Sequence, residues 1–206
     1  MLVSFGPITA WQILNLVRSH PGKISNEEPS NLGLAAGIIG ELVILAAVLA
    51  IGKLRGWSLT TFGSRISWPG TGAAILLFVV TVIAMSGVGV WMDIIHPEHA
   101  SYAVAGVSVP IILLFSIINP VFEEVLEAGY FIRSLERFGM WPAIFASALL
   151  RSLLHWWQGI NGPFSIFAMG VIFGFAYWRW RQLWPLVVAH ALCDLLAAFY
   201  WSHHAT

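Results

Sequence analysis

The sequence has few charged residues and only one cysteine. Charged side chains make up 10% of the 206 residues, whereas a soluble domain usually carries about 25%. Hydrophobic residues make up 58%, with 11 Trp and 13 Phe, which is more apolar surface than a soluble core of this length can bury. The lone Cys193 excludes an intrachain disulfide and a cysteine-based metal site. We therefore expect lipid to be the solvent for much of the chain.

Two further features are missing. The 10 basic and 10 acidic residues balance to a formal net charge of zero, so no excess of positive charge indicates nucleic acid as a partner. The first twenty residues lack the basic segment and the small-residue cleavage site of a signal peptide, so we expect no cleavage there.

Apolar runs long enough to cross a bilayer recur along the chain. Crossing about 30 Å of hydrocarbon takes roughly 17–25 helical residues. The runs of this kind are 32–51, 70–95, 103–135, 141–157, 164–180 and 183–201. Residues 2–17 are apolar but shorter, and would form a seventh span or an interfacial helix. The sequence thus predicts an all-α protein, a polytopic transmembrane helix bundle of about six to seven spans.

Lysine and arginine occur in alternate loops between these runs. The basic loops contain Lys53, Arg55, Arg65, Arg133, Arg137, Arg179 and Arg181. The intervening loops, 96–100 and 158–163, contain neither residue type. By the positive-inside rule, the basic loops lie in the cytoplasm and the last predicted span ends on the opposite side.

Three carboxylates lie inside the third run, in the segment NPVFEEVLEAG over residues 119–129. Glu123 precedes Arg133 by ten residues, which at helical rise is roughly 15 Å and places it near the middle of the bilayer. Glu123 and Glu127 share one face of an α-helix, and Glu124 is expected to point about 100° away from them. Three carboxylates at this depth cannot all stay charged and unpaired, and such an environment suits a general base that works near neutral pH.

Two later segments bring histidine into predicted spans. Arg151 and His155 are spaced i,i+4 and share a helix face, and so do His190 and Asp194. His155 would lie about 21 Å and His190 about 10 Å from the cytoplasmic boundary, and helix tilt can bring both to the depth of Glu123. We therefore expect three helices to converge on one hydrated cavity.

Structural interpretations of the same residues stay open. Glu123 and Glu124 would then be a buried pair that holds helices together. His155 would be an interfacial histidine next to two tryptophans, and His190 with Asp194 a hydrogen bond between helices. In lipid the cost of such groups is high, which favours a functional site.

The order of these groups resembles the CPBP family of intramembrane endopeptidases, which includes the CAAX prenyl endopeptidase of eukaryotes. That family is marked by Glu-Glu-x-x-x-Arg, Phe-x-x-x-His and His-x-x-x-Asn/Asp motifs on successive core helices. Matching positions lie in order over roughly residues 105–200, and residues 183–194, LWPLVVAHALCD, match best. Residues 55–63, RGWSLTTFG, resemble the cytoplasmic loop of many bacterial members. The resemblance implies N-terminal membrane helices and a cytoplasmic loop over residues 1–100 and a catalytic core over residues 101–206.

The resemblance also implies a role for each residue of the site. Glu123 would be the general base that activates water, and His155 would hold the same water. His190 and Asp194 would stabilise the oxyanion, with Glu124 as a supporting carboxylate. Because an ionised Asp194 cannot donate a hydrogen bond, it must be protonated for this role or must orient His190 instead.

The implied protein is a protease that hydrolyses a peptide bond of a hydrophobic or prenylated, CAAX-like peptide in a bacterial inner membrane. Zinc is the alternative to metal-free activation of water, since Glu123, His155 and His190 are side chains that zinc accepts. The sequence contains none of the tight zinc spacings such as His-Glu-x-x-His. We therefore favour a site without a metal and expect no cofactor.

Two positions depart from the family motifs. Ala128 stands at the motif's Arg position, and Arg151 stands at the motif's Phe position. One cation is thus lost from one helix and another appears on its neighbour. We hypothesise that Arg151, a structural cation, reaches across to neutralise Glu124 or Glu127.

Other functions stay open beside the protease. The alternative is a non-catalytic member of the family, acting as a membrane scaffold or in self-immunity against a bacteriocin, and the motif departures at Ala128 and Arg151 support it. Buried acids and histidines also occur in proton-coupled or metal transporters, but the sequence shows no inverted repeat. Glu41, a lone acid in the first run, would bond a neighbouring helix or take part in substrate entry.

Overall fold

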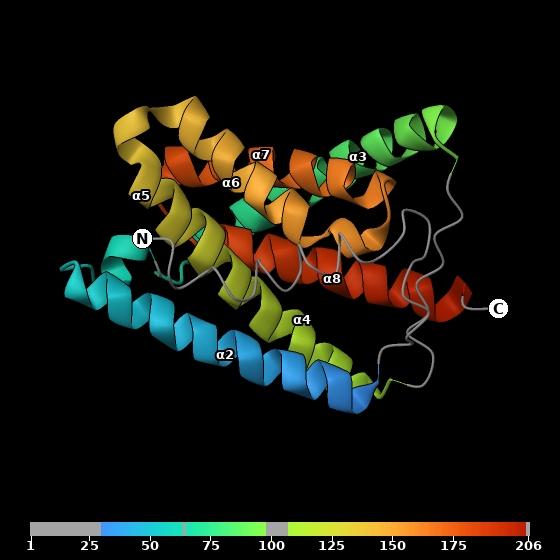
Figure 1. The fold of residues 1–206 in the computed structure, drawn as a ribbon, viewed down its shortest axis with the longest axis horizontal. Coiled ribbons are helices and arrows are strands. Elements are labelled where there is room, and N and C mark those ends of the chain that lie inside the picture. Colours follow the sequence, from blue (N-terminus) through green and yellow to red (C-terminus); the bar gives the residue numbers. More distant parts are fainter. Residues whose placement is uncertain (1–29, 64, 98–106, 205–206) are drawn as a thin grey trace.

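The protein folds as a bundle of helices. A computed structural model describes residues 30–63, 65–97 and 107–204, and all regular structure in these residues is helical (Figure 1). The main helices are α2 (Asn31–Leu54), α3 (Trp68–Ile95), α4 (Val109–Glu123), the π-helix η2 (Glu124–Ile132), α5 (Arg133–Leu135), α6 (Met140–Leu154), α7 (Asn161–Trp180) and α8 (Trp184–His204). Short 3₁₀ segments are η1 (Leu59–Phe62), η3 (Glu136–Phe138) and η4 (Trp156–Gln158). The all-α fold class is confirmed, and the apolar run 2–17 lies outside the described residues.

The helices have the length and surface of membrane helices. Three of them are long and apolar enough to cross a bilayer: Asn31–Leu54, Trp68–Ile95 and the continuous stretch Val109–Phe138. Met140–Leu154 and Trp184–Tyr200 are shorter apolar helices. Ile39, Ile83 and Ile117 are each more than half exposed, as contact with lipid requires. The chain is a membrane protein, and the predicted count of six to seven spans is confirmed only for the first three runs.

The expected span over residues 141–157 is wrong at its C-terminal end. The helix α6 stops at Leu154, and His155 has the non-helical dihedral angles φ −99° and ψ 13°. A 3₁₀ turn follows and ends at Gly159, which has a φ of +84°. Glycine adopts this conformation without a steric penalty, so the chain can turn back into α7 there. His155 therefore lies in a turn at the end of a helix rather than inside one.

The basic loops gather at one end of the bundle. The amide of Leu183, between α7 and α8, donates to the carbonyl of Gly63, 3.0 Å away in the loop after α2. Arg181 pairs with Glu136, which follows α5. At the other end, the side chain of the first residue of α7 donates to the carbonyl of His96. The alternation of basic and uncharged loops along the sequence thus corresponds to two ends of the structure.

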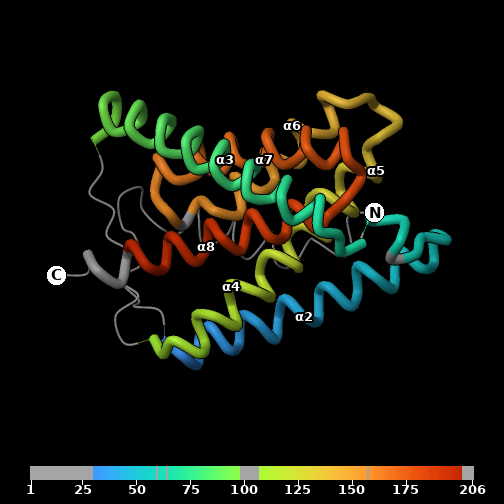
Figure 2. Tube along the Cα trace, turned by 180° about the vertical axis from the view of Figure 1, so that it is seen from behind, coloured from blue at the N-terminus to red at the C-terminus, as the bar shows by residue number. Residues whose placement is uncertain are grey.

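The helix α4 and its continuation η2 lie between other helices. The helix α2 runs alongside α4 in both views (Figures 1 and 2), and α8 packs against α4 as well. The helix α6 packs against η2, and α3 packs against α7 and α8. Residues on α4 and η2 can therefore meet side chains from α2, α6 and α8.

The helices α6 and α7 approach each other closely at Gly170. A Cβ atom added to Gly170 would lie 2.8 Å from the Cα and 2.9 Å from the Cβ of Ala148 on α6. The nearest atom belongs to the backbone, so a side chain at Gly170 would push the two helices apart.

We expect Gly170→Ala to lower the unfolding temperature in detergent, with a cost of about 1–3 kcal/mol from overpacking. The matched control is Gly37→Ala on α2, where nothing lies within 4 Å of the added Cβ. Alanine favours the helix over glycine by about 1 kcal/mol, so the control should keep or raise the unfolding temperature. Equal shifts for the two variants would contradict the close contact of α6 with α7.

Candidate active site

The three carboxylates lie where α4 changes into the π-helix η2. Pro120 lies inside α4 and has no N–H to donate, and the π-helix begins four residues later, at Glu124. Glu124 and Glu127 are fully buried, whereas the side chain of Glu123 is 12% exposed. An α-helix would place Glu124 about 100° away from Glu123 and Glu127, and here all three contact the same residue, Arg151. The turn that carries Glu124 and Glu127 is π-helical, and π-helical turns often mark functional sites.

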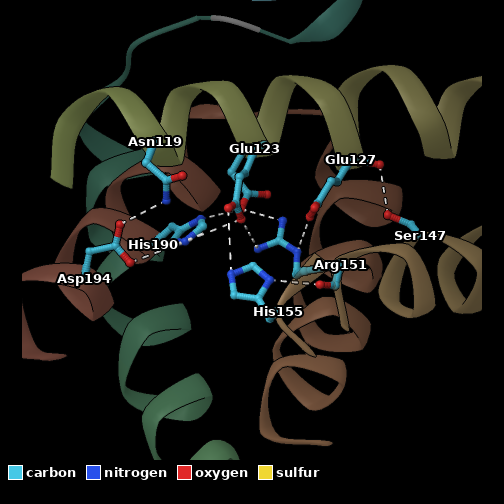
Figure 3. A network of polar contacts seen from close by, with 9 residues as sticks. Asn119, Glu123, Glu127, Ser147, Arg151, His155, His190 and Asp194 are labelled. Carbon is cyan, nitrogen blue, oxygen red and sulfur yellow. Dashed lines mark hydrogen bonds and ion pairs between the residues drawn. The ribbon is translucent and has the colours of Figure 1, made fainter. Parts of the chain in front are cut away.

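Arg151 extends from α6 to all three carboxylates (Figure 3). Its Nη2 donates to Oε1 of Glu124 at 2.7 Å, and its Nε pairs with Glu127. Its Nη1 lies 3.9 Å from Oε2 of Glu123. The guanidinium also lies 5.6 Å from the ring centroid of Phe173. The contact across helices that we hypothesised from the sequence is therefore present, and it reaches both candidate partners.

Two imidazoles face Glu123. Nε2 of His155 lies 3.8 Å from Oε1 of Glu123, and Nε2 of His190 lies 3.9 Å from Oε2. Both gaps are too long for a direct hydrogen bond and suit one bridging water molecule. Nδ1 of His155 is 2.8 Å from the carbonyl oxygen of Arg151, and Nδ1 of His190 is 2.8 Å from Oε1 of Glu124. These contacts fix both rings and leave each Nε2 directed at Glu123.

Asp194 and Asn119 form the side of the site nearest to α2 and α8. Oδ1 of Asp194 lies 3.5 Å from Nε2 of His190, and its Oδ2 lies 3.4 Å from the side-chain nitrogen of Asn119 (Figure 3). The side chain of Asp194 is 23% exposed, and Asn119 is buried. We assigned no role to Asn119 from the sequence. The available signal was its i,i+4 spacing to Glu123, which places an amide one turn before the carboxylate.

The site as a whole brings together the residues predicted to carry chemistry. They come from α4 with η2, from the end of α6 and from α8, which are the three helical segments expected to converge. The residues are Glu123, Glu124, Glu127, Arg151, His155, His190 and Asp194. Their catalytic roles stay predictions. Within residues 30–63, 65–97 and 107–204, no group of three or more His, Cys, Asp or Glu is arranged to hold a metal ion.

The chemistry available at this site is acid–base chemistry in a largely buried setting. Glu124 and Glu127 are occupied by Arg151, so neither is free to exchange a proton easily. Glu123 is more distant from the guanidinium and keeps some exposure. A carboxylate in this position, with two imidazoles within reach of a shared water, can move a proton to and from a reacting group.

Comparison with protein families gives one match. Residues 104–196 match the model of the family described as type II CAAX prenyl endopeptidase Rce1-like. The matched segment contains every residue of the candidate site, whereas α2 and α3 lie outside it. Comparisons with curated proteins and with solved structures give no match.

We expect Arg151→Ala to reduce the yield of folded protein, because it leaves two fully buried carboxylates without a cation. Breaking a buried ion pair in this way typically costs about 3–5 kcal/mol. The double variant Arg151→Ala with Glu127→Ala should recover part of the yield, measured as the monodisperse fraction in detergent. Arg179→Ala, which removes an exposed cation from α7, is the matched control. A double variant no better than the single one would contradict the pairing of Arg151 with Glu127.

Proposed function

Because residues 104–196 match the model of the type II CAAX prenyl endopeptidase Rce1-like family, we propose that this protein is an intramembrane endopeptidase. The proposed reaction is hydrolysis of a peptide bond in a hydrophobic or prenylated, CAAX-like peptide. The observation that carries the proposal is the position of Glu123, whose two oxygens lie 3.8 Å and 3.9 Å from the Nε2 atoms of two histidines inside a membrane helix bundle.

In the proposed mechanism, Glu123 is the general base. A water molecule held between Glu123 and His155 gives a proton to the carboxylate while its oxygen attacks the scissile carbonyl. The protonated Glu123 then gives that proton to the departing amine, which leaves a peptide carboxylic acid and an amine. The other two carboxylates are unsuited to this role, because Arg151 already pairs with both.

His190 and Asp194 are the proposed stabilisers of the oxyanion. Nδ1 of His190 donates to Glu124, so Nε2 is the ring nitrogen left to face a substrate oxygen, and it donates there when the ring is an imidazolium. Such donors contribute most when they are already in place before the charge develops. Asp194 lies within 3.5 Å of the same Nε2 and can orient the ring, or it can donate directly when protonated.

The membrane setting supports a peptide substrate that enters from lipid. Six helical passes connect the two ends of the bundle in the described residues, namely α2, α3, α4 to α5, α6, α7 and α8. We propose that all six cross the bilayer of a bacterial inner membrane with the basic end in the cytoplasm. The shorter or more polar helices α6, α7 and α8 would cross inside the bundle, where protein partly replaces lipid.

We expect Glu123→Gln to lower kcat by about 10²–10⁴-fold, because the amide cannot accept the proton of the attacking water. The assay uses purified protein in liposomes and a farnesylated peptide with a quenched fluorophore pair across the bond to be cleaved. Glu136→Gln makes the same chemical change outside the site and should keep wild-type activity. If Glu123→Gln cleaves as fast as the wild type, the proposed mechanism is wrong. If the wild type does not cleave, and cells that carry Glu123→Gln behave like cells that carry the wild type rather than like cells without the protein, the chain is a non-catalytic scaffold.

We expect the farnesylated peptide to have a kcat/KM on the order of 10²-fold higher than the same peptide with a methyl group on its cysteine. Each buried CH₂ contributes about 0.8 kcal/mol to membrane partitioning, so the lipid concentrates the substrate at the depth of the site. The control repeats the assay in detergent micelles that hold equal amounts of the two peptides, so that any remaining difference in kcat/KM does not come from partitioning. Equal kcat/KM values for the two peptides in liposomes would exclude the prenylated substrate class.

A further inference from the structure

Glu41 is an acidic residue of α2 that contacts the site from outside the family-matched segment. It is the only acidic residue in α2, and α2 packs against α4 and η2. Its Oε2 is buried and has no hydrogen-bond partner. A carboxylate placed in a membrane helix is costly unless it is bonded, so its position calls for a partner on α4.

Asn119 is that partner. As drawn, its side-chain oxygen faces the carboxylates of Glu41 and Glu123, and two acceptors cannot bond each other. Turning the amide by 180° places its nitrogen 3.0 Å from Oε1 of Glu41 and 3.2 Å from Oε1 of Glu123. The drawn orientation offers the nitrogen one longer contact, 3.4 Å to Asp194. The turned amide gives up that contact and uses both of its hydrogens on Glu41 and Glu123, while its oxygen faces Oδ2 of Asp194 and accepts from that carboxyl when Asp194 is protonated.

We propose that Glu41 is a positioning residue for Glu123 and acts through Asn119. By accepting one N–H of Asn119, Glu41 directs the second N–H at Oε1 of Glu123. This inference rests on the proposed function of Glu123 as a general base. Through Glu41, the helix α2 would then help to position the general base, although α2 lies outside the family-matched segment.

The two oxygens of Glu123 then have different tasks. Oε1 is held by Asn119 and faces Nε2 of His155 at 3.8 Å. Oε2 is buried and has no hydrogen-bond partner, and it lies 3.9 Å from both Nη1 of Arg151 and Nε2 of His190. Oε1, which faces His155, is thus the oxygen that takes the proton from the water held there, and the bond from Asn119 fixes its direction, whereas Oε2 stays enclosed by Arg151 and His190.

The test is a cycle of variants at Glu41 and Asn119 in the liposome assay. Glu41→Leu, which places an apolar side chain in α2, should lower kcat about tenfold and leave KM unchanged, as expected for one lost hydrogen bond. Asn119→Ala should have a similar effect, and the double variant should be no slower than Asn119→Ala alone. Glu41→Gln should stay within about threefold of the wild type, because the amide oxygen still accepts from Asn119.

Controls separate positioning from loss of packing. Ile38→Ala removes a buried side chain one turn before Glu41 and should lower the unfolding temperature without lowering kcat. If Glu41→Leu folds poorly, Glu41→Ala takes its place, and we expect the same loss in kcat. The unfolding temperatures of the cycle variants give a readout that needs no activity, and the double variant should melt no lower than the less stable single variant.

Several results would overturn the inference. Losses in kcat that multiply in the double variant, a change in KM alone, or failure of Glu41→Gln to restore activity would each contradict it. Cleavage that is abolished by Glu123→Gln but unchanged by Glu41→Leu would overturn the role of Glu41 and leave the proposed function standing. Absence of cleavage by the wild type would overturn both.

Discussion

The site depends on one buried cation, the guanidinium of Arg151, which compensates a group of carboxylates inside a membrane bundle. Glu124 and Glu127 have no solvent exposure, and each pairs directly with Arg151. In a medium of low dielectric constant, each such charge without a cation would cost several kcal/mol. The pairing also joins α6 to η2, and Glu124 extends the connection to His190 on α8. The helices that carry the site are therefore held together by the charges that the site contains.

The same pairing separates the tasks of the three carboxylates. A carboxylate bound closely by a guanidinium is a poor general base, because its negative charge is already compensated. Glu123 lies farther from Arg151, at 3.9 Å, and its remaining contacts are with two imidazoles and an amide. In the proposed mechanism, two of the acids stabilise the architecture and the third, Glu123, carries the chemistry. The cation that pairs with the two structural acids, Arg151, lies on α6, whereas the motif of the similar family has its cation at the position of Ala128 on η2.

The family-matched segment does not form the surroundings of the site alone. The matched residues 104–196 supply the carboxylates and imidazoles. The helix α2 precedes them and covers α4, and its only acid reaches the amide of Asn119. The loop after α2 also bonds to the loop before α8, at the end of the bundle where the basic residues gather. The N-terminal helices are therefore connected to both the site and the basic end.

The sequence by itself determined the helical class, the membrane environment, the two ends of the bundle and the set of chemical groups in the site. These follow from local properties, namely the length of apolar runs, the placement of Lys and Arg, and the cost of charge in lipid. Only the tertiary structure decided the π-helical turn at Glu124, the end of α6 at Leu154 and the place of Asn119 between Glu41 and Glu123. An α-helical repeat read from the sequence cannot predict them, because each depends on which distant segments pack together. At the π-helical turn and at the end of α6, the backbone adopts the geometry that lets the buried charged side chains meet their partners.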